Sequence, residues 1–193
     1  DRVAALSRVK TADGLAACAT RKARLPVVSE GRAREVLGDL APTGKVPGWM
    51  RVLANFPVAG KRQVTAFLAT EKELQLDDLT RAQMAWVIAR QNGAWYSLSE
   101  AQSRLVALGQ KPEQIAELEG WEFSGARGSL SDKQVALLTI AKNLGASPVV
   151  LTDEQVAEAL KQSSPRDVVQ AVHYTAMRSL FDRFTEAAAL PAD

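Results

Sequence analysis

The side chains able to carry acid–base or nucleophilic chemistry are few in this chain. Cys18 is the only cysteine and His173 the only histidine. One cysteine cannot form an internal disulfide, and one cysteine, one histidine and scattered carboxylates give no metal-ligand spacing. A Cys–His pair would exist only if the fold brought these two distant residues together. The sequence therefore predicts no metal and no cofactor.

A second group of candidates follows a break near the middle of the chain. Apolar residues at helical spacing predict a helix from about Leu79, and Asn92-Gly93 is a strong break signal. A second helix then runs to Gly109, a favourable residue just past a helix end. The start of such a helix presents backbone N–H groups and the positive end of the dipole, which suits anions and activated thiols.

This central stretch resembles the signature of the alkylhydroperoxidase D-like / carboxymuconolactone decarboxylase family. That signature has a Glu on the first helix, then Asn-Gly, then Cys-x-Tyr-Cys, and a His one turn later. Asn92-Gly93 and Tyr96 match it. The four working groups are replaced: the Glu position is Ala82, the two Cys positions are Ala94 and Ser97, and the His position is Ala101.

The resemblance implies hydroperoxide reduction by a peroxidase-like, antioxidant oxidoreductase, or decarboxylation of a small carboxylated lactone. The Ser97 hydroxyl, however, cannot cycle through a disulfide, and no neighbouring base activates it. The three alanines supply neither acid nor base. We therefore expect no thiol peroxidase activity. The alternative is a pseudoenzyme, a catalytically silent protein that binds a ligand or forms oligomers on the same scaffold.

The residues around the break are the candidate lining of a pocket. Such a pocket would be mainly apolar, with a few polar groups at the ends of side chains. The lining residues are Trp86, Gln91, Asn92, Trp95, Tyr96 and Ser97. In the other interpretation, Trp86 and Trp95 only fill the space left by the missing groups. The candidate catalytic residues are Glu100, Ser97, Tyr96 and His173. Glu100 lies one position before the missing His, but helix-face carboxylates are more often solvated, and His173 among apolar neighbours suits a core or interface position.

The rest of the pattern predicts an all-α fold, a bundle of about seven helices around this central helix-hairpin-helix, as the resemblance also implies. Residues 1–25 form an N-terminal arm and residues 26–193 a single domain. Ser29 is an expected N-cap, Thr152 and Gln155 form a capping pair, and Pro165 opens a last helix. That helix is expected to run to about Ala189, and it carries the apolar residues Val168, Val169, Val172, Ala176, Leu180, Phe181 and Phe184.

Composition narrows the class of protein. A length of 193 residues suits one domain with a proper core, and 47% hydrophobic with 24% charged residues is typical of globular proteins. A net charge of +2 is too weak for a nucleic-acid footprint, and no apolar run predicts a membrane helix. The resemblance implies self-association as a homotrimer or homohexamer, with a small molecule as a further ligand. The cytoplasm is the default compartment, although N-terminal processing or export stays open because the chain begins with Asp.

Overall fold

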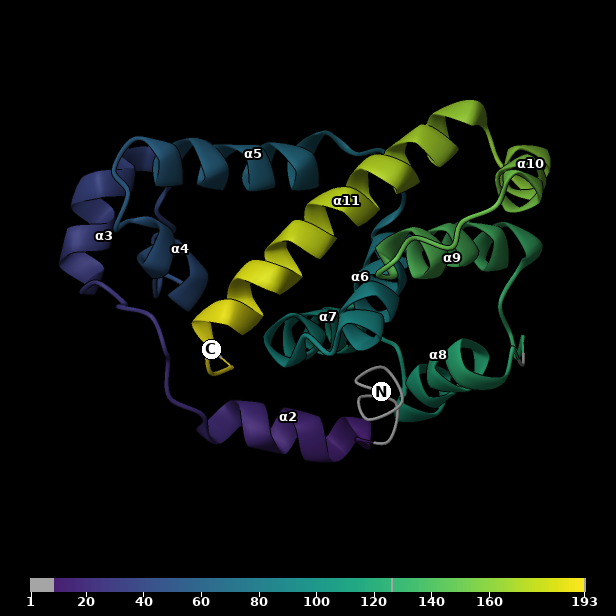
Figure 1. The fold of residues 1–193 in the computed structure, drawn as a ribbon, viewed down its shortest axis with the longest axis horizontal. Coiled ribbons are helices and arrows are strands. Elements are labelled where there is room, and N and C mark those ends of the chain that lie inside the picture. The colour runs from purple at the N-terminus through teal and green to yellow at the C-terminus, as the bar shows by residue number, and fades with distance from the viewer. Residues whose placement is uncertain (1–8, 126, 193) are drawn as a thin grey trace.

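Helix α6 (Asp78–Asn92) is the centre of the computed structural model, which describes residues 9–125 and 127–192. Every residue of this helix from Thr80 to Arg90 is buried. A helix that is covered on all sides must lie in the middle of a bundle, and α6 packs against α7 (Trp95–Ala107), α9 (Asp132–Gly145) and α11 (Pro165–Ala188) (Figure 1).

Local sequence sets both ends of α6. The Asp77 carboxylate accepts a hydrogen bond from the Thr80 backbone N–H at 2.8 Å, which is an N-cap. Gly93 ends the helix with φ of 61°, a left-handed conformation that glycine adopts without strain. The chain reverses there and α7 starts two residues later, so the expected helix, break and second helix are all present.

The N-terminal half wraps one side of this centre. It comprises α2 (Thr11–Thr20), α3 (Glu30–Leu37), a 3₁₀ turn (Gly38–Leu40), α4 (Gly48–Leu53) and α5 (Ala59–Glu73). Ser29 caps α3 as expected, by accepting from the Arg32 N–H. Helix α2 lies along α7, while α5 lies across the opposite side of the molecule (Figure 1).

The C-terminal half supplies the remaining helices. These are α8 (Pro112–Ser124), α9, α10 (Asp153–Gln162) and α11. Thr152 and Gln155 form the expected capping box of α10, and Pro165 opens α11. Helix α11 runs diagonally through the molecule, between α5 on one side and α7 on the other (Figure 1).

The all-α prediction is confirmed: ten α-helices and no strand occur in the described ranges, where about seven helices were expected. The surplus comes from short helices such as α4, whose six residues are hard to recognise from periodicity alone. None of the helices in the described part combines the length and the hydropathy that a membrane-spanning segment requires.

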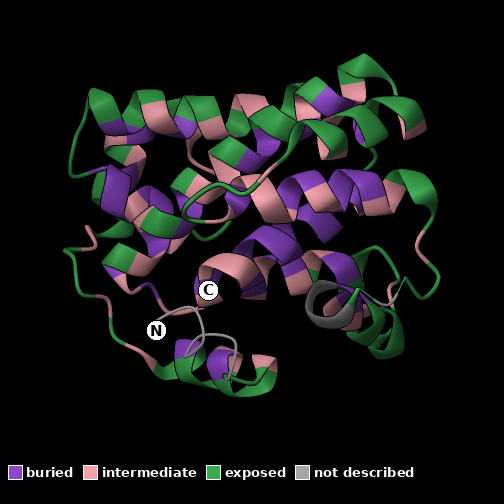
Figure 2. Cartoon of the chain, turned by 45° about the vertical axis from the view of Figure 1, so that its right-hand side comes forward, coloured by how far each residue is buried: buried purple, intermediate pink, exposed green. Residues whose placement is uncertain are grey.

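Only part of the apolar surface of α11 is buried. Val168 and Phe181 are buried, but Val169, Val172 and Leu180 are 68%, 38% and 48% exposed. Apolar residues occur around most of this helix, so helical periodicity allows two overlapping stripes. Packing against α6, α7 and α9 selects the stripe that also carries Tyr174 and Asp182. Figure 2 shows the same separation for the molecule as a whole, with buried residues toward the inside of the bundle and exposed residues on its outer surface.

Candidate functional site

All four degenerate motif positions lie inside the protein. Ala82, Ala94 and Ser97 are fully buried and Ala101 is 3% exposed. Trp86, also fully buried, belongs to the same hydrophobic cluster as the three alanines. The three alanines of the motif therefore belong to the hydrophobic core.

The start of α7 already holds an anion from the protein itself. The Glu186 carboxylate, in the last turn of α11, accepts the Tyr96 backbone N–H at 3.4 Å. Arg21 holds the same carboxylate in a two-pronged contact of 2.8 and 2.9 Å. The helix N-terminus that suits an activated thiol is thus occupied by a neutralised carboxylate.

Ser97 lies in a small buried polar group. Its hydroxyl is 3.5 Å from the Thr185 hydroxyl and faces Asp182, which also accepts a hydrogen bond from the Asn92 side chain at 2.9 Å. Asp182 is 1% exposed, and burial raises the pKa of its carboxyl to about 6 against the opposing effects of Arg178, Asn92 and Ser97. The contact of Asp182 with Asn92 ties α11 to the α6–α7 break.

The lone cysteine and histidine do not meet. Cys18 is 1% exposed and its thiol lies 3.6 Å from the Leu190 carbonyl, at the C-terminal end of α11. His173 is exposed in the first half of that helix, about 20 Å away along its axis, with its ring 3.2 Å from the Thr70 hydroxyl. Burial raises the pKa of the Cys18 thiol, which makes it less reactive.

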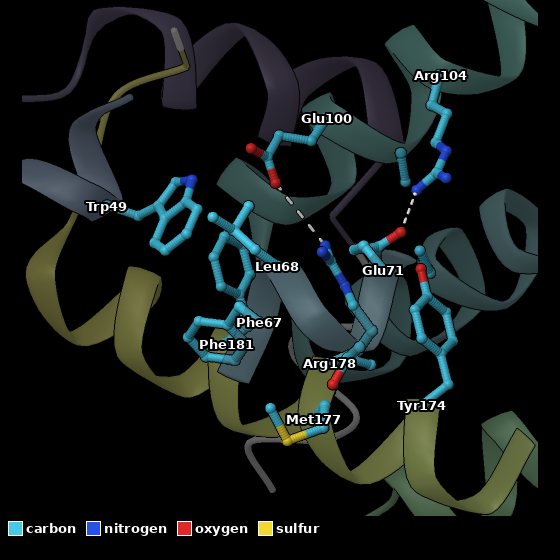
Figure 3. Close-up of a pocket in the computed structure, with 13 residues that line it drawn as sticks. Trp49, Phe67, Leu68, Glu71, Glu100, Arg104, Tyr174, Met177, Arg178 and Phe181 are labelled. Carbon is cyan, nitrogen blue, oxygen red and sulfur yellow. Dashed lines mark hydrogen bonds and ion pairs between the residues drawn. The ribbon is translucent and has the colours of Figure 1, made fainter. Parts of the chain in front are cut away.

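A cavity of about 300 Å³ opens at Ala101, the last of the motif positions, between α4, α5, α6, α7 and α11 (Figure 3). This volume lies at the lower end of the range for ligand pockets and suits a single ring with small substituents. The lining consists of Trp49, Phe67, Leu68, Thr70, Glu71, Ala85, Glu100, Ala101, Arg104, Tyr174, Met177, Arg178 and Phe181.

Aromatic rings form one side of this cavity. Trp49, Phe67 and Phe181 pack edge to face in a triangle with ring centroids 5.3–5.7 Å apart. Such contacts hold the rings at fixed angles. Figure 3 shows these rings on one side of the pocket, with Glu71, Arg104 and Tyr174 on the other.

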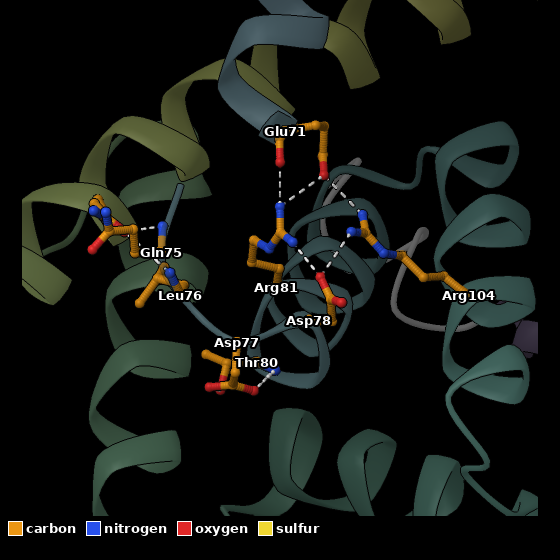
Figure 4. Close-up of polar contacts among 9 residues, drawn as sticks. Glu71, Gln75, Leu76, Asp77, Asp78, Thr80, Arg81 and Arg104 are labelled. Atoms are coloured by element: carbon orange, nitrogen blue, oxygen red, sulfur yellow. Dashed lines mark hydrogen bonds and ion pairs between the residues drawn. The ribbon is translucent and has the colours of Figure 1, made fainter. Parts of the chain in front are cut away.

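The opposite side is charged, and most of its charges are engaged within the protein. Glu71 accepts from Arg104 at 2.9 Å and from Arg81 at 3.4 Å, and both arginines also contact Asp78 (Figure 4). This network joins the end of α5 to α6 and α7. The Tyr174 hydroxyl lies beside it, and burial raises the pKa of that hydroxyl well above its usual value, so it stays protonated.

Arg178 stands apart from this network, between the two sides of the cavity (Figure 3). Its side chain is 15% exposed, and its Nη2 atom lies 3.8 Å from Oε2 of Glu100, beyond hydrogen-bond distance. The guanidinium also lies over the Phe181 ring, 4.7 Å from the centroid. The cavity therefore contains one arginine that its neighbours do not hold firmly.

The structure brings only part of the predicted site to this cavity. Glu100 lines it, and so does Ala101, the missing His position. None of the six candidate pocket residues, Trp86, Gln91, Asn92, Trp95, Tyr96 and Ser97, lines it, and neither does His173. Sequence reasoning missed Tyr174, Arg178 and Phe181. Their i, i+4, i+7 spacing was a usable signal, because an arginine between two aromatic residues on one helical face marks a polar interruption of a core.

The comparisons with known proteins support the fold. No family model matches the chain, and no curated protein matches its sequence. Among solved structures, the apo form of the debrominase Bmp8 superposes with a TM-score of 0.66 over 84% of this chain and 82% of that chain, at 14% identity. A Cys→Ala variant of Bmp8 in complex with 2,3,4-tribromopyrrole gives 0.70 over 91% and 94%, at 13% identity. At these identities the likeness shows a shared all-helical fold.

Proposed function

We propose that this chain is a member of the alkylhydroperoxidase D-like superfamily that binds a compact ring-shaped molecule in the cavity between α5, α7 and α11, without thiol redox chemistry. The observation that supports the proposal is the cavity itself, which is open at Ala101 while the other three motif positions are enclosed. An apolar wall with a few convergent polar groups is typical of small-molecule sites.

The fold neighbours are consistent with such a ligand. Bmp8 is a debrominase, and its Cys→Ala variant was solved with a compact brominated ring. This chain has Ala94 and Ser97 where the resemblance places the thiols, so it is comparable to a thiol-free form of the scaffold. Ring binding on a frame of this kind does not need the thiol.

The cavity wall lacks the side chains that thiol redox turnover requires. The only sulfur on the cavity wall is the thioether of Met177, which neither forms a thiolate nor a disulfide. Cys18 is buried elsewhere, against the end of α11. The function supported best is therefore binding, and neither hydroperoxide reduction nor debromination.

Calorimetric titration of the purified chain with 2,3,4-tribromopyrrole tests this proposal. We expect saturable binding at one site per chain, and no bromide release above a protein-free control in the presence of a dithiol reductant. Ala101→Phe should abolish binding by filling the cavity. Ser103→Phe, on the exposed side of the same helix, is the matched control and should bind as the parent does.

Two results would contradict the proposal. The first is that neither calorimetry nor ligand-observed NMR detects binding of 2,3,4-tribromopyrrole up to its solubility limit, which would mean that the cavity does not bind this ring. Protein-dependent release of bromide, still present after Cys18→Ser, would show chemistry that the described side chains do not explain.

A further inference from the structure

We infer that the ligand of this cavity is an uncharged ring carrying a carbonyl oxygen, and that Arg178 donates the hydrogen bonds to that oxygen. This inference rests on the proposed function, because it specifies the class of molecule that the same cavity accepts. It depends on three features: the Arg178 guanidinium, which makes no hydrogen bond within the described ranges, the balance of charges on the wall, and the aromatic side.

Arg178 makes no hydrogen bond to any residue in the described ranges. Its Nε is buried without a partner, and its nearest carboxylate, Glu100, is 3.8 Å away. A guanidinium has five N–H donors and no acceptor, so whatever satisfies it must supply lone pairs. A largely buried donor left without a hydrogen bond is energetically costly. The Nη groups of Arg178, unlike Nε, are not buried, and they are the donors that an oxygen placed in the cavity would engage.

Arg104, the other arginine on the wall, is not available to a ligand in the same way. It donates to Glu71 at 2.9 Å and lies 3.6 Å from Asp78 (Figure 4). A ligand oxygen would have to displace these carboxylates to reach it. Arg178 is therefore the donor that a ligand can engage without breaking an existing hydrogen bond.

The charges on the wall exclude a net-charged ligand. Two carboxylates, Glu71 and Glu100, face two guanidinium groups, Arg104 and Arg178, so the lining is neutral as a set. Asp182 acts on Arg178 from outside the cavity as a further negative charge. An anion would meet Glu100 at close range and find no surplus positive charge to offset its desolvation. A carbonyl accepts from Arg178 without that penalty.

The aromatic side specifies the remainder of the molecule. Trp49 and Phe67, together with Met177, give an apolar wall whose rings are held at fixed angles, and a cavity of about 300 Å³ leaves room for one ring rather than two. The ring would pack on this wall while its carbonyl points to Arg178.

The test compares three ligands of nearly equal size: acetophenone, ethylbenzene and benzoate. Each is titrated into the intact chain by calorimetry or ligand-observed NMR. We expect acetophenone to bind about ten-fold or more tightly than ethylbenzene, the usual effect of a hydrogen bond from a charged donor. Benzoate should bind no more tightly than ethylbenzene. In Arg178→Gln the advantage of acetophenone should fall to about three-fold or less, with ethylbenzene unchanged. Arg183→Gln, an exposed arginine on the same helix, should leave all three affinities as they were.

The outcomes separate the two proposals. Equal binding of acetophenone and ethylbenzene overturns the carbonyl assignment while the ring site stands. Tightest binding of benzoate also overturns it, in favour of an anion site. If none of the three ligands and no tribromopyrrole binds, the proposed function fails as well. Because the ligand series is measured on the unmodified chain, the result does not depend on how Arg178→Gln folds.

Discussion

Asp182 shows how a single buried carboxyl can make stability depend on pH. It accepts from Asn92 at 2.9 Å, but its other oxygen is buried without a hydrogen bond of ordinary geometry among the described residues. Burial without full compensation disfavours the ionised form, which is why the pKa rises to about 6. The residue holds the α6–α7 break against α11 best when it is protonated.

Between about pH 4 and pH 6 the folded chain binds this proton more strongly than the unfolded chain does. The free energy of unfolding should therefore be highest below the usual pKa of 3.8 and fall as the pH rises through about 6. The rise in pKa corresponds to about 3 kcal/mol. Asp182→Asn should remove this component. We expect the stability of the variant relative to the parent to increase by up to that amount between pH 4 and pH 7 in urea denaturation. A constant difference across this range would show that Asp182 titrates normally.

The chemistry-bearing residues illustrate the limit of sequence reasoning at this scale. The loss of the thiol, Glu and His groups is visible in the letters at Ala82, Ala94, Ser97 and Ala101. The importance of Arg178 is not, because an arginine on a helix is usually solvated. Only its position between α5 and α7 leaves it largely buried and without a hydrogen bond in the described ranges.

At the scale of elements, α2 is part of the body of the protein as the structure describes it. Gly14 lies against the Trp95 ring, Cys18 is buried in the second hydrophobic cluster, and Arg21 holds Glu186. The sequence suggested an arm over residues 1–25, of which residues 1–8 lie outside the described part. Helix α2 packs over the start of α7 and so helps to close the motif region.

Gly14→Ala tests this packing. A Cβ at position 14 would come within 2.2 Å of the Trp95 ring, so α2 or the indole must move. Overpacking of this kind costs about 1–3 kcal/mol, or about 2–4 °C in Tm for each kcal/mol in a chain of this size.

Gly31→Ala is the matched control, because Gly31 is an exposed helical glycine in α3 with no heavy atom near its Cβ position. Its Tm should stay the same or rise, since alanine favours the helix by up to about 1 kcal/mol. Equal effects of the two substitutions would show that α2 does not pack tightly on α7.

At the scale of the whole molecule, we propose that the chain self-associates. Val169, Val172 and Leu180 are exposed apolar residues on one stripe of α11, and exposed apolar stripes commonly mark protein interfaces. The family resemblance implies the same outcome, a homotrimer or homohexamer. A symmetric oligomer that uses α11 would cover this stripe.

Sedimentation velocity measures the state directly. We expect the parent chain to sediment as an oligomer and the Val169→Lys, Val172→Lys double variant to shift toward the 20.8 kDa monomer. The control variant Val149→Lys replaces an exposed valine outside α11 and should sediment as the parent chain does. A parent chain that sediments as a monomer at micromolar concentration would end this proposal.

The sequence alone determined the helical class, the break at Asn92-Gly93, the caps at Ser29 and Thr152, and the absence of thiol and histidine groups at the motif. These features depend on local backbone preferences and on residue identity, which need no knowledge of the partners. The tertiary structure alone decided which face of α11 is buried and that, of the four motif positions, only Ala101 lines the open cavity. It also decided that Arg178 is the unsatisfied donor. Each of these follows from which helices pack together, and helical periodicity cannot specify that when apolar residues lie on more than one face.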